Sequence, residues 1–100
     1  MPTLMKYFHR THQAPATVLA QSAQFFGGRL APTEEMPSRR KFAGAIGHVI
    51  ITAAAEGGHY TLVTVETNQP GESEVDRLAK RFLTLVHAAA DPGHVVRGAY

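Results

Sequence analysis

The sequence predicts a single α+β domain in which a small antiparallel sheet packs against a long C-terminal helix, with elements in the order β-α-loop-β-β-α. The chain has 100 residues, which suffices for one hydrophobic core and makes residues 1–100 one domain. Two β-rich runs flank Gly57 and Gly58, a pattern typical of a hairpin. An apolar stripe at helical spacing then runs through residues 73–90.

The first two elements are a strand and a helix. Residues 3–12 are rich in Tyr, Phe and Thr, which favours a strand. In that strand Tyr7, His9 and Thr11 face one side, and Phe8, Arg10 and His12 face the other. A helix is predicted over residues 15–26, because Pro15 suits a first helical position and apolar residues recur at helical spacing. Gly27 and Gly28 can take positive φ and end it.

Residues 29–40 are predicted to form a loop, with at most a short strand at residues 29–31. Pro32 and Pro37 interrupt this segment, so neither a helical nor a strand period runs through it. Glu34 and Glu35 lie beside Arg39 and Arg40 in the sequence, and we interpret them as a solvated charge patch.

The β-rich run that starts at Lys41 is predicted to form a hairpin with a turn at Gly57 and Gly58. Opposing Glu56 to His59 places four residues on one face, with Ile50 across from Val65 and Thr52 across from Val63. Both faces of this hairpin carry apolar residues. We therefore expect a ligand, a partner subunit or a helix to cover the second face.

The second helix is predicted over residues 73–90. Ser73 is a suitable N-cap, and Glu74 and Asp76 favour the positive end of the helix dipole. Asp76 and Lys80 are spaced to form an ion pair. The sequence Asp-Pro-Gly at residues 91–93 ends the helix, and residues 92–100 are predicted to be a frayed tail.

Composition and charge exclude several classes of protein. The absence of cysteine excludes disulfides and thiol chemistry. There is no hydrophobic segment of signal-peptide length near the N-terminus, and the apolar run at residues 49–55 is too short to span a membrane, so we expect a cytoplasmic protein. The net charge is only +2, which makes nucleic acid an unfavoured partner.

Histidines and basic residues supply the candidates for chemistry. The chain contains six histidines, and a metal site is an alternative to structural or surface roles for them. No motif of a serine hydrolase, phosphate-binding loop or zinc protease occurs, so we name no catalytic residue and no cofactor and favour a protein that is not an enzyme. The metal candidates are His9, His12, His48 and His59, and the nucleic-acid candidates are Arg39, Arg40 and Lys41.

The segment Gly58–Thr67, followed by the helix over residues 73–90, resembles the end of a helix-grip domain of the START and Bet v 1-like superfamily, which is sometimes grouped with polyketide cyclases. Residues 3–26 resemble the start of the same domain. The resemblance implies an antiparallel sheet that grips the C-terminal helix, with any apolar ligand held between them. This chain is shorter and lacks several central strands of that family, so two copies would complete a fuller sheet.

The leading hypothesis is a small binding or interaction module that forms a homodimer and can hold a small apolar ligand. A histidine-dependent metal protein or enzyme is the first alternative, and a nucleic-acid accessory protein is the second. The residues expected to line the groove or interface come from the hairpin and the second helix: Ile50, Thr52, Val63, Val65, Phe82 and Val86.

Overall fold

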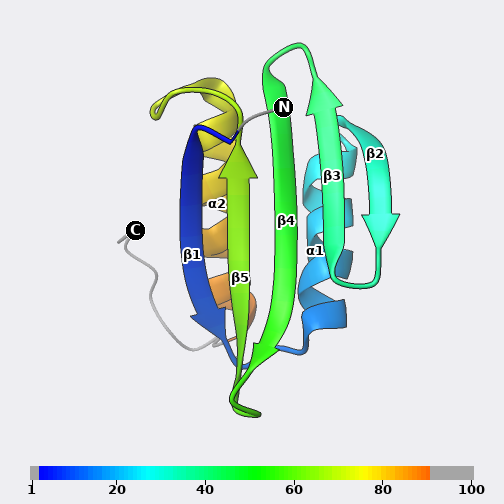
Figure 1. Cartoon of the computed structure of the whole chain (residues 1–100), viewed down its shortest axis with the longest axis vertical. Helices are drawn as coiled ribbons and strands as arrows, with labels where there is room; N and C mark the ends of the chain where they lie inside the picture. Colours follow the sequence, from blue (N-terminus) through cyan, green and yellow to red (C-terminus); the bar gives the residue numbers. More distant parts are fainter. Residues whose placement is uncertain (1–2, 91–100) are drawn as a thin grey trace.

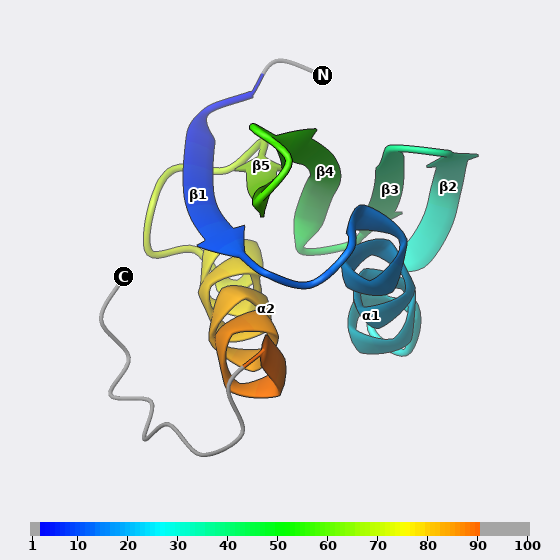
Figure 2. The same cartoon turned by 90° about the horizontal axis from the view of Figure 1, so that it is seen from below.

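The computed structural model describes residues 3–90, which form a five-stranded antiparallel sheet and two helices. The strand order is β1-β5-β4-β3-β2, so the first and last strands are neighbours. Both helices pack on the same face of the sheet (Figures 1 and 2), and the predicted α+β class is confirmed. The elements are β1 (Met5–Thr11), α1 (Pro15–Gly27), β2 (Ala31–Met36), β3 (Arg39–Gly44), β4 (Gly47–Glu56), β5 (Tyr60–Thr67) and α2 (Glu74–Ala90).

The first strand and the first helix confirm their predictions. Alternate residues of β1 are half-buried and exposed, with Tyr7 and His9 on the helix side and Phe8 on the other. Pro15 occupies the first turn of α1, and the helix ends at Gly27 with Gly28 as its C-cap. The helix stop at the two glycines is confirmed, but neither uses its freedom to take a positive φ: Gly28 has φ −85°, and its N–H bonds to the Phe26 carbonyl.

Residues 29–40 are not a loop, which corrects the prediction. They form β2 and the start of β3, joined by a tight turn at Pro37 and Ser38. The pairing of these strands shifts register between Pro32 and Glu34. Because β2 is an edge strand, a proline that cannot donate a ladder hydrogen bond is tolerated there. The prolines therefore mark an irregular edge strand rather than the absence of a strand.

The turn between β4 and β5 is longer than predicted. Glu56 pairs with Tyr60 rather than with His59. Gly57 and Gly58 both adopt positive φ, at 63° and 75°, and His59 completes a turn between them and β5. A turn one residue longer moves every following pair by one position.

This shift sorts the hairpin residues differently from the prediction. Val65 lies across from Ile51 rather than Ile50, and Val63 lies across from Ala53 rather than Thr52. Since side chains alternate along a strand, one face now carries buried apolar residues and the other carries a mixed set. The predicted grouping of four residues on one face was wrong.

The second helix begins as predicted. The backbone N–H of Asp76 donates to Oγ of Ser73 at 3.2 Å, the geometry of an N-cap. The expected ion pair between Asp76 and Lys80 is absent: Lys80 pairs instead with Glu72 at 3.6 Å, and Asp76 is fully buried. The predicted helix stop at residues 91–93 and the tail at residues 92–100 lie outside the described residues.

The core lies between the sheet and the two helices. Phe26 of α1 and Phe82 of α2 are fully buried, with ring centroids 5.3 Å apart. Phe25 and Phe42 contact this pair at centroid distances of 5.8 and 5.5 Å. Such aromatic contacts contribute beyond their buried area, so they hold both helices on the same face.

Candidate functional site

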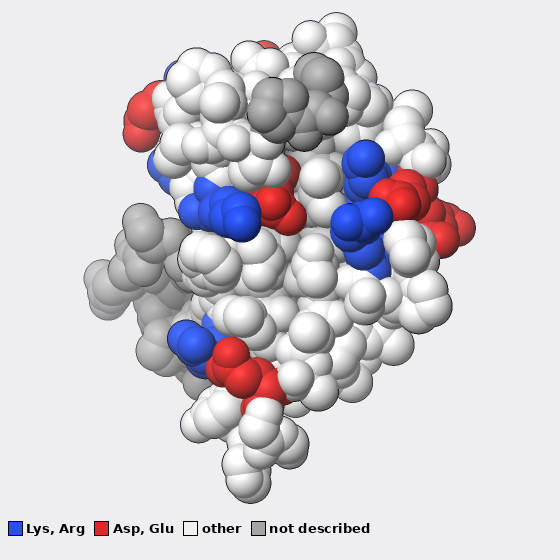
Figure 3. Space-filling view, viewed as in Figure 1, with Lys and Arg blue, Asp and Glu red and all other residues white. Residues whose placement is uncertain are grey.

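The face of the sheet that carries no helix is the candidate site, and we refer to it as the open sheet face. It consists of the side chains of all five strands that point away from α1 and α2. Figure 3 views the molecule from this side and shows basic and acidic groups next to one another around an uncharged centre. Three large hydrophobic side chains of its strands are exposed: Phe8 at 58%, Tyr60 at 45% and Met36 at 44%.

The strand register arranges these side chains in rows that cross the sheet. Residues directly opposite one another share a face, so the pairing of neighbouring strands extends each row across the sheet. The charged row, read from β2 to β1, is Glu34, Lys41, Ile50, Glu66 and Lys6. The threonine row beside it, read in the same direction, is Met36, Arg39, Thr52, Thr64 and Phe8.

Ion pairs surround the centre of the open sheet face. Nε of Arg10 lies 2.6 Å from Oε1 of Glu56, and this hydrogen bond, together with the carboxylate charge, raises the pKa of Arg10 above its ordinary value. Lys6 and Glu66 approach to 3.9 Å. Exposed pairs of this kind stabilise a protein little. They nevertheless fix where positive and negative charges lie on the face.

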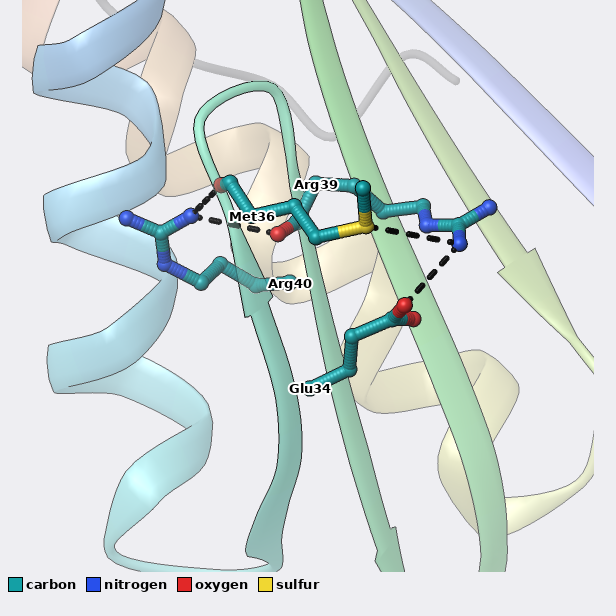
Figure 4. A network of polar contacts seen from close by, with 4 residues as sticks. All are labelled: Glu34, Met36, Arg39 and Arg40. Carbon is teal, nitrogen blue, oxygen red and sulfur yellow. Dashed lines mark hydrogen bonds and ion pairs between the residues drawn. The ribbon is translucent and has the colours of Figure 1, made fainter.

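The third pair anchors the edge of the sheet and is shown in Figure 4. One guanidinium nitrogen of Arg39 lies 3.1 Å from Oε2 of Glu34, and the same nitrogen contacts the Met36 sulfur at 3.7 Å. Nε of Arg39 and the second oxygen of Glu34 are buried without a hydrogen-bond partner among the described residues. The pair is therefore held by one contact rather than by two parallel ones.

The structure separates the three basic residues that were candidates for nucleic-acid binding. They lie on β3, where alternate side chains point to opposite faces. Arg39 and Lys41 lie on the open sheet face, whereas Arg40 lies on the other side (Figure 4). Arg40 donates to the carbonyls of Met36 and Arg39. These residues do not form one continuous basic surface.

The four candidate metal-binding histidines occupy different environments. His9 lies on the helix side of β1, with its ring centroid 5.5 Å from that of His87. Burial, and then the charge of His87, lower the pKa of His9 below its ordinary value. His12 stacks at a tilt on Tyr60 at 4.8 Å.

The other two candidate histidines lie at opposite ends of β4. The backbone N–H of His48 donates to Oδ1 of Asn68 at 2.7 Å, and His59 is exposed in the turn after β4. Within residues 3–90 no three groups of metal-binding type come together. No shared metal site among these histidines is supported by this arrangement.

Four of the residues expected to line a groove belong to the core. Val63, Val65, Phe82 and Val86 are fully buried, on the side of the sheet that the helices cover. The space between the sheet and α2 is thus occupied by the protein's own side chains. Ile50 and Thr52 instead lie on the open sheet face, in the charged row and the threonine row.

The buried carboxylate of Asp76 joins β1, β5 and α2, a role that the sequence analysis did not predict for this residue. Oδ1 of Asp76 accepts hydrogen bonds from the Tyr7 hydroxyl at 2.7 Å and from the Thr67 hydroxyl at 2.8 Å. Oδ2 accepts from the Ser73 hydroxyl. The signal in the sequence was an aspartate three residues after the N-cap, but its partners on two strands are distant in the chain.

Burial raises the pKa of Tyr7 to about 12, assisted by its hydrogen bond to Asp76 and by the charges of Asp76 and Glu72. A phenol held neutral in this way is a donor that satisfies a buried acceptor. We interpret this cluster as structural, since Asp76 is fully buried and its carboxylate joins β1, β5 and the start of α2 through three hydroxyl donors.

Comparisons with known proteins identify no family. No family model matches the sequence, and no curated protein is similar to it at a significant level. The resemblance to the helix-grip superfamily is therefore supported only as far as an α+β fold with an antiparallel sheet and two helices. Among residues 3–90, no helix is long and apolar enough to cross a membrane.

Proposed function

We propose that this protein is a small binding module that acts as a homodimer, with the open sheet faces of two copies packed against each other. The exposed side chains of Phe8 and Met36, at opposite edges of the sheet, are the hydrophobic groups that such contact would bury. Removal of exposed apolar surface from water is the main driving force for association.

The charged row carries the proposal, because its charges are complementary to those of a second copy. Consider two sheets face to face about a twofold axis parallel to β4. A residue on β3 then faces the residue of the same row on β5 of the second copy, and a residue on β2 faces the one on β1. Glu34 faces Lys6, Lys41 faces Glu66, and Ile50 faces its own copy.

The threonine row fits the same axis. Met36 on β2 and Phe8 on β1 lie equally far from β4, so each would pack against the other across the interface. Methionine and aromatic side chains make favourable contacts. Thr52, which lies on β4, would face its own copy. Sheets packed in this aligned manner lie about 10 Å apart, a gap that side chains of this length span.

The same charges favour a protein partner over nucleic acid. Three of the cations on the open sheet face already have a carboxylate within 4.0 Å: Lys6, Arg10 and Arg39. Binding to phosphates requires cations free to replace the counterions of the backbone. A face on which positive and negative groups alternate instead favours a protein surface that places a negative group opposite each positive one.

Sedimentation velocity of the purified protein tests the proposal. We expect a dimer at micromolar concentrations, and we expect Phe8→Asp to dissociate it because a carboxylate would be buried against Met36. Leu85→Asp is the matched control, since Leu85 is a similarly exposed hydrophobic residue on α2. A monomeric wild-type protein, or equal effects of the two substitutions, would overturn the proposal.

A further inference from the structure

A cleft of about 500 Å³ lies between α2, the segment that follows α1 and the turn between β3 and β4. It lies at the end of the sheet where α1 ends, α2 begins and the turn between β3 and β4 passes (Figure 1). Its volume is in the range of small-molecule sites. The proposed dimer leaves it uncovered, so its role is independent of that proposal.

The cleft has an apolar floor formed by three elements. Leu30 follows α1 and is 6% exposed, Leu78 lies on α2 and is 7% exposed, and Ile46 lies in the turn between β3 and β4 and is half-buried. Ala45 adds a further small side chain beside Ile46. These residues offer an alkyl or aromatic group an apolar surface to pack on.

Three arginines form the rim of the same cleft. Arg77 and Arg81 are four residues apart on α2 and therefore lie on one side of the helix. Arg29 lies across the cleft from them, on the segment that follows α1. Its guanidinium donates to the Phe25 carbonyl at 2.6 Å and lies 4.5 Å from the centre of the Phe25 ring, which fixes its position. Glu74 is the acidic residue of the lining.

The charge on this rim is not balanced within the described part of the chain. Three guanidinium groups stand against the one carboxylate of Glu74. Neither Arg77 nor Arg81 is within 4.0 Å of a carboxylate in residues 3–90, in contrast to Arg10 and Arg39 on the open sheet face. Like charges one turn apart on a helix repel each other, and a bound anion would relieve that repulsion.

We infer that the cleft binds a small apolar acid, with its carboxylate on the guanidinium rim and its alkyl chain or ring on the floor. Arginine presents paired N–H donors that match the two oxygens of a carboxylate. The positive end of the α2 dipole lies at the same end of the molecule and favours the same charge. Neither the floor nor the rim alone specifies this ligand, but together they select an amphiphilic anion.

Isothermal titration calorimetry with octanoate tests the inference on the full-length protein. We expect octanoate to bind one site per chain, and we expect octan-1-ol and acetate to bind at least about tenfold more weakly, because each lacks one half of the recognised chemistry. Equal affinity for octanol would show adsorption on an apolar surface, and would overturn the inference. Failure of octanoate to bind the folded protein would overturn it as well.

Variants locate the site. We expect Arg77→Gln with Arg81→Gln to weaken octanoate binding by at least about tenfold, without loss of the helix, because both side chains are exposed. Arg10→Gln on the open sheet face is the matched control and should leave the affinity unchanged. Unchanged affinity in the Arg77 and Arg81 variant, with a normal melting transition, would contradict the assignment.

Discussion

The hydroxyl of Tyr7 donates a 2.7 Å hydrogen bond to the carboxylate of Asp76, 69 positions further along the chain. This bond joins the first strand to the last helix. Asp76 is fully buried and also accepts from Thr67, so three elements depend on one side chain. The stability of the fold should therefore be sensitive to this carboxylate.

Removal of the Tyr7 hydroxyl should destabilise the protein measurably. Tyr7→Phe deletes one hydrogen bond to a charged acceptor, and we expect the free energy of unfolding in urea to fall by about 1.5 kcal/mol. Asp76→Ala should cost more, about 3 kcal/mol, because the hydroxyls of Tyr7, Thr67 and Ser73 all lose their acceptor. Tyr60→Phe, at an exposed tyrosine, is the control and should change the value by less than about 0.5 kcal/mol. Equal effects at Tyr7 and Tyr60 would contradict the structural role of this cluster.

Because Tyr7 can ionise, its contribution to stability should be lost at alkaline pH. The pKa of Tyr7 is raised to about 12 in the folded protein, above its ordinary value of about 10, so folding favours the protonated phenol. Its contribution should be complete below pH 10 and should disappear as the pH rises through 12. Tyrosinate absorbance during a pH titration checks this, since Tyr7→Phe should remove a transition near pH 12. Loss of an earlier transition instead would contradict it.

Acid should weaken the contact between β1 and α2. The pKa of His9 is lowered by burial and by His87, so the folded state favours neutral His9. That contribution is present above the ordinary histidine pKa of about 6.5 and is lost as the pH falls through the lower folded-state value. Melting temperatures measured from neutral to acidic pH should fall less steeply in His9→Gln than in the wild type. His59→Gln, in the exposed turn between β4 and β5, is the control and should show the same dependence of melting temperature on pH as the wild type. A His9→Gln protein whose melting temperature falls as steeply as that of the wild type would refute the prediction.

Two glycines should respond in opposite ways to a methyl group. Gly47 has φ 134°, and an added Cβ would lie 2.9 Å from Oδ1 of Asn68 and from Cγ of Gln69. We expect Gly47→Ala to destabilise by about 1–3 kcal/mol. Gly28 has φ −85° and open space around it, so Gly28→Ala should be neutral or should stabilise by up to about 1 kcal/mol. Chemical denaturation of both variants distinguishes these outcomes, and equal changes would contradict the account of Gly47.

Three elements, β1, α1 and α2, could be predicted from patterns among neighbouring residues. The alternation in β1, the proline that opens α1 and the Ser73 cap of α2 are all readable from neighbouring residues. Two features depend on more distant information. β2 escapes prediction because Pro32 is tolerated only on an edge strand, and the chain alone does not reveal which strand is at the edge.

The candidate site was harder to predict than the fold. Its composition depends on the register of β4 and β5, and a turn of one additional residue exchanges the two faces of a strand. Ile50 was placed with Val65, although the structure puts it beside Glu66. The acceptors and donors around Asp76 come from three elements, so no local pattern indicates them.

The charge order across the open sheet face is the most direct test of the proposed homodimer. In that dimer Lys41 faces Glu66 of the second copy, so Lys41→Glu or Glu66→Lys alone would place like charges opposite each other twice, once on each side of the axis. Sedimentation equilibrium should show each single substitution to weaken dimerisation by about tenfold or more, and the double substitution to restore it. Single variants that dimerise like the wild type, or a double variant as weak as the single ones, would contradict the proposed pairing of the two faces.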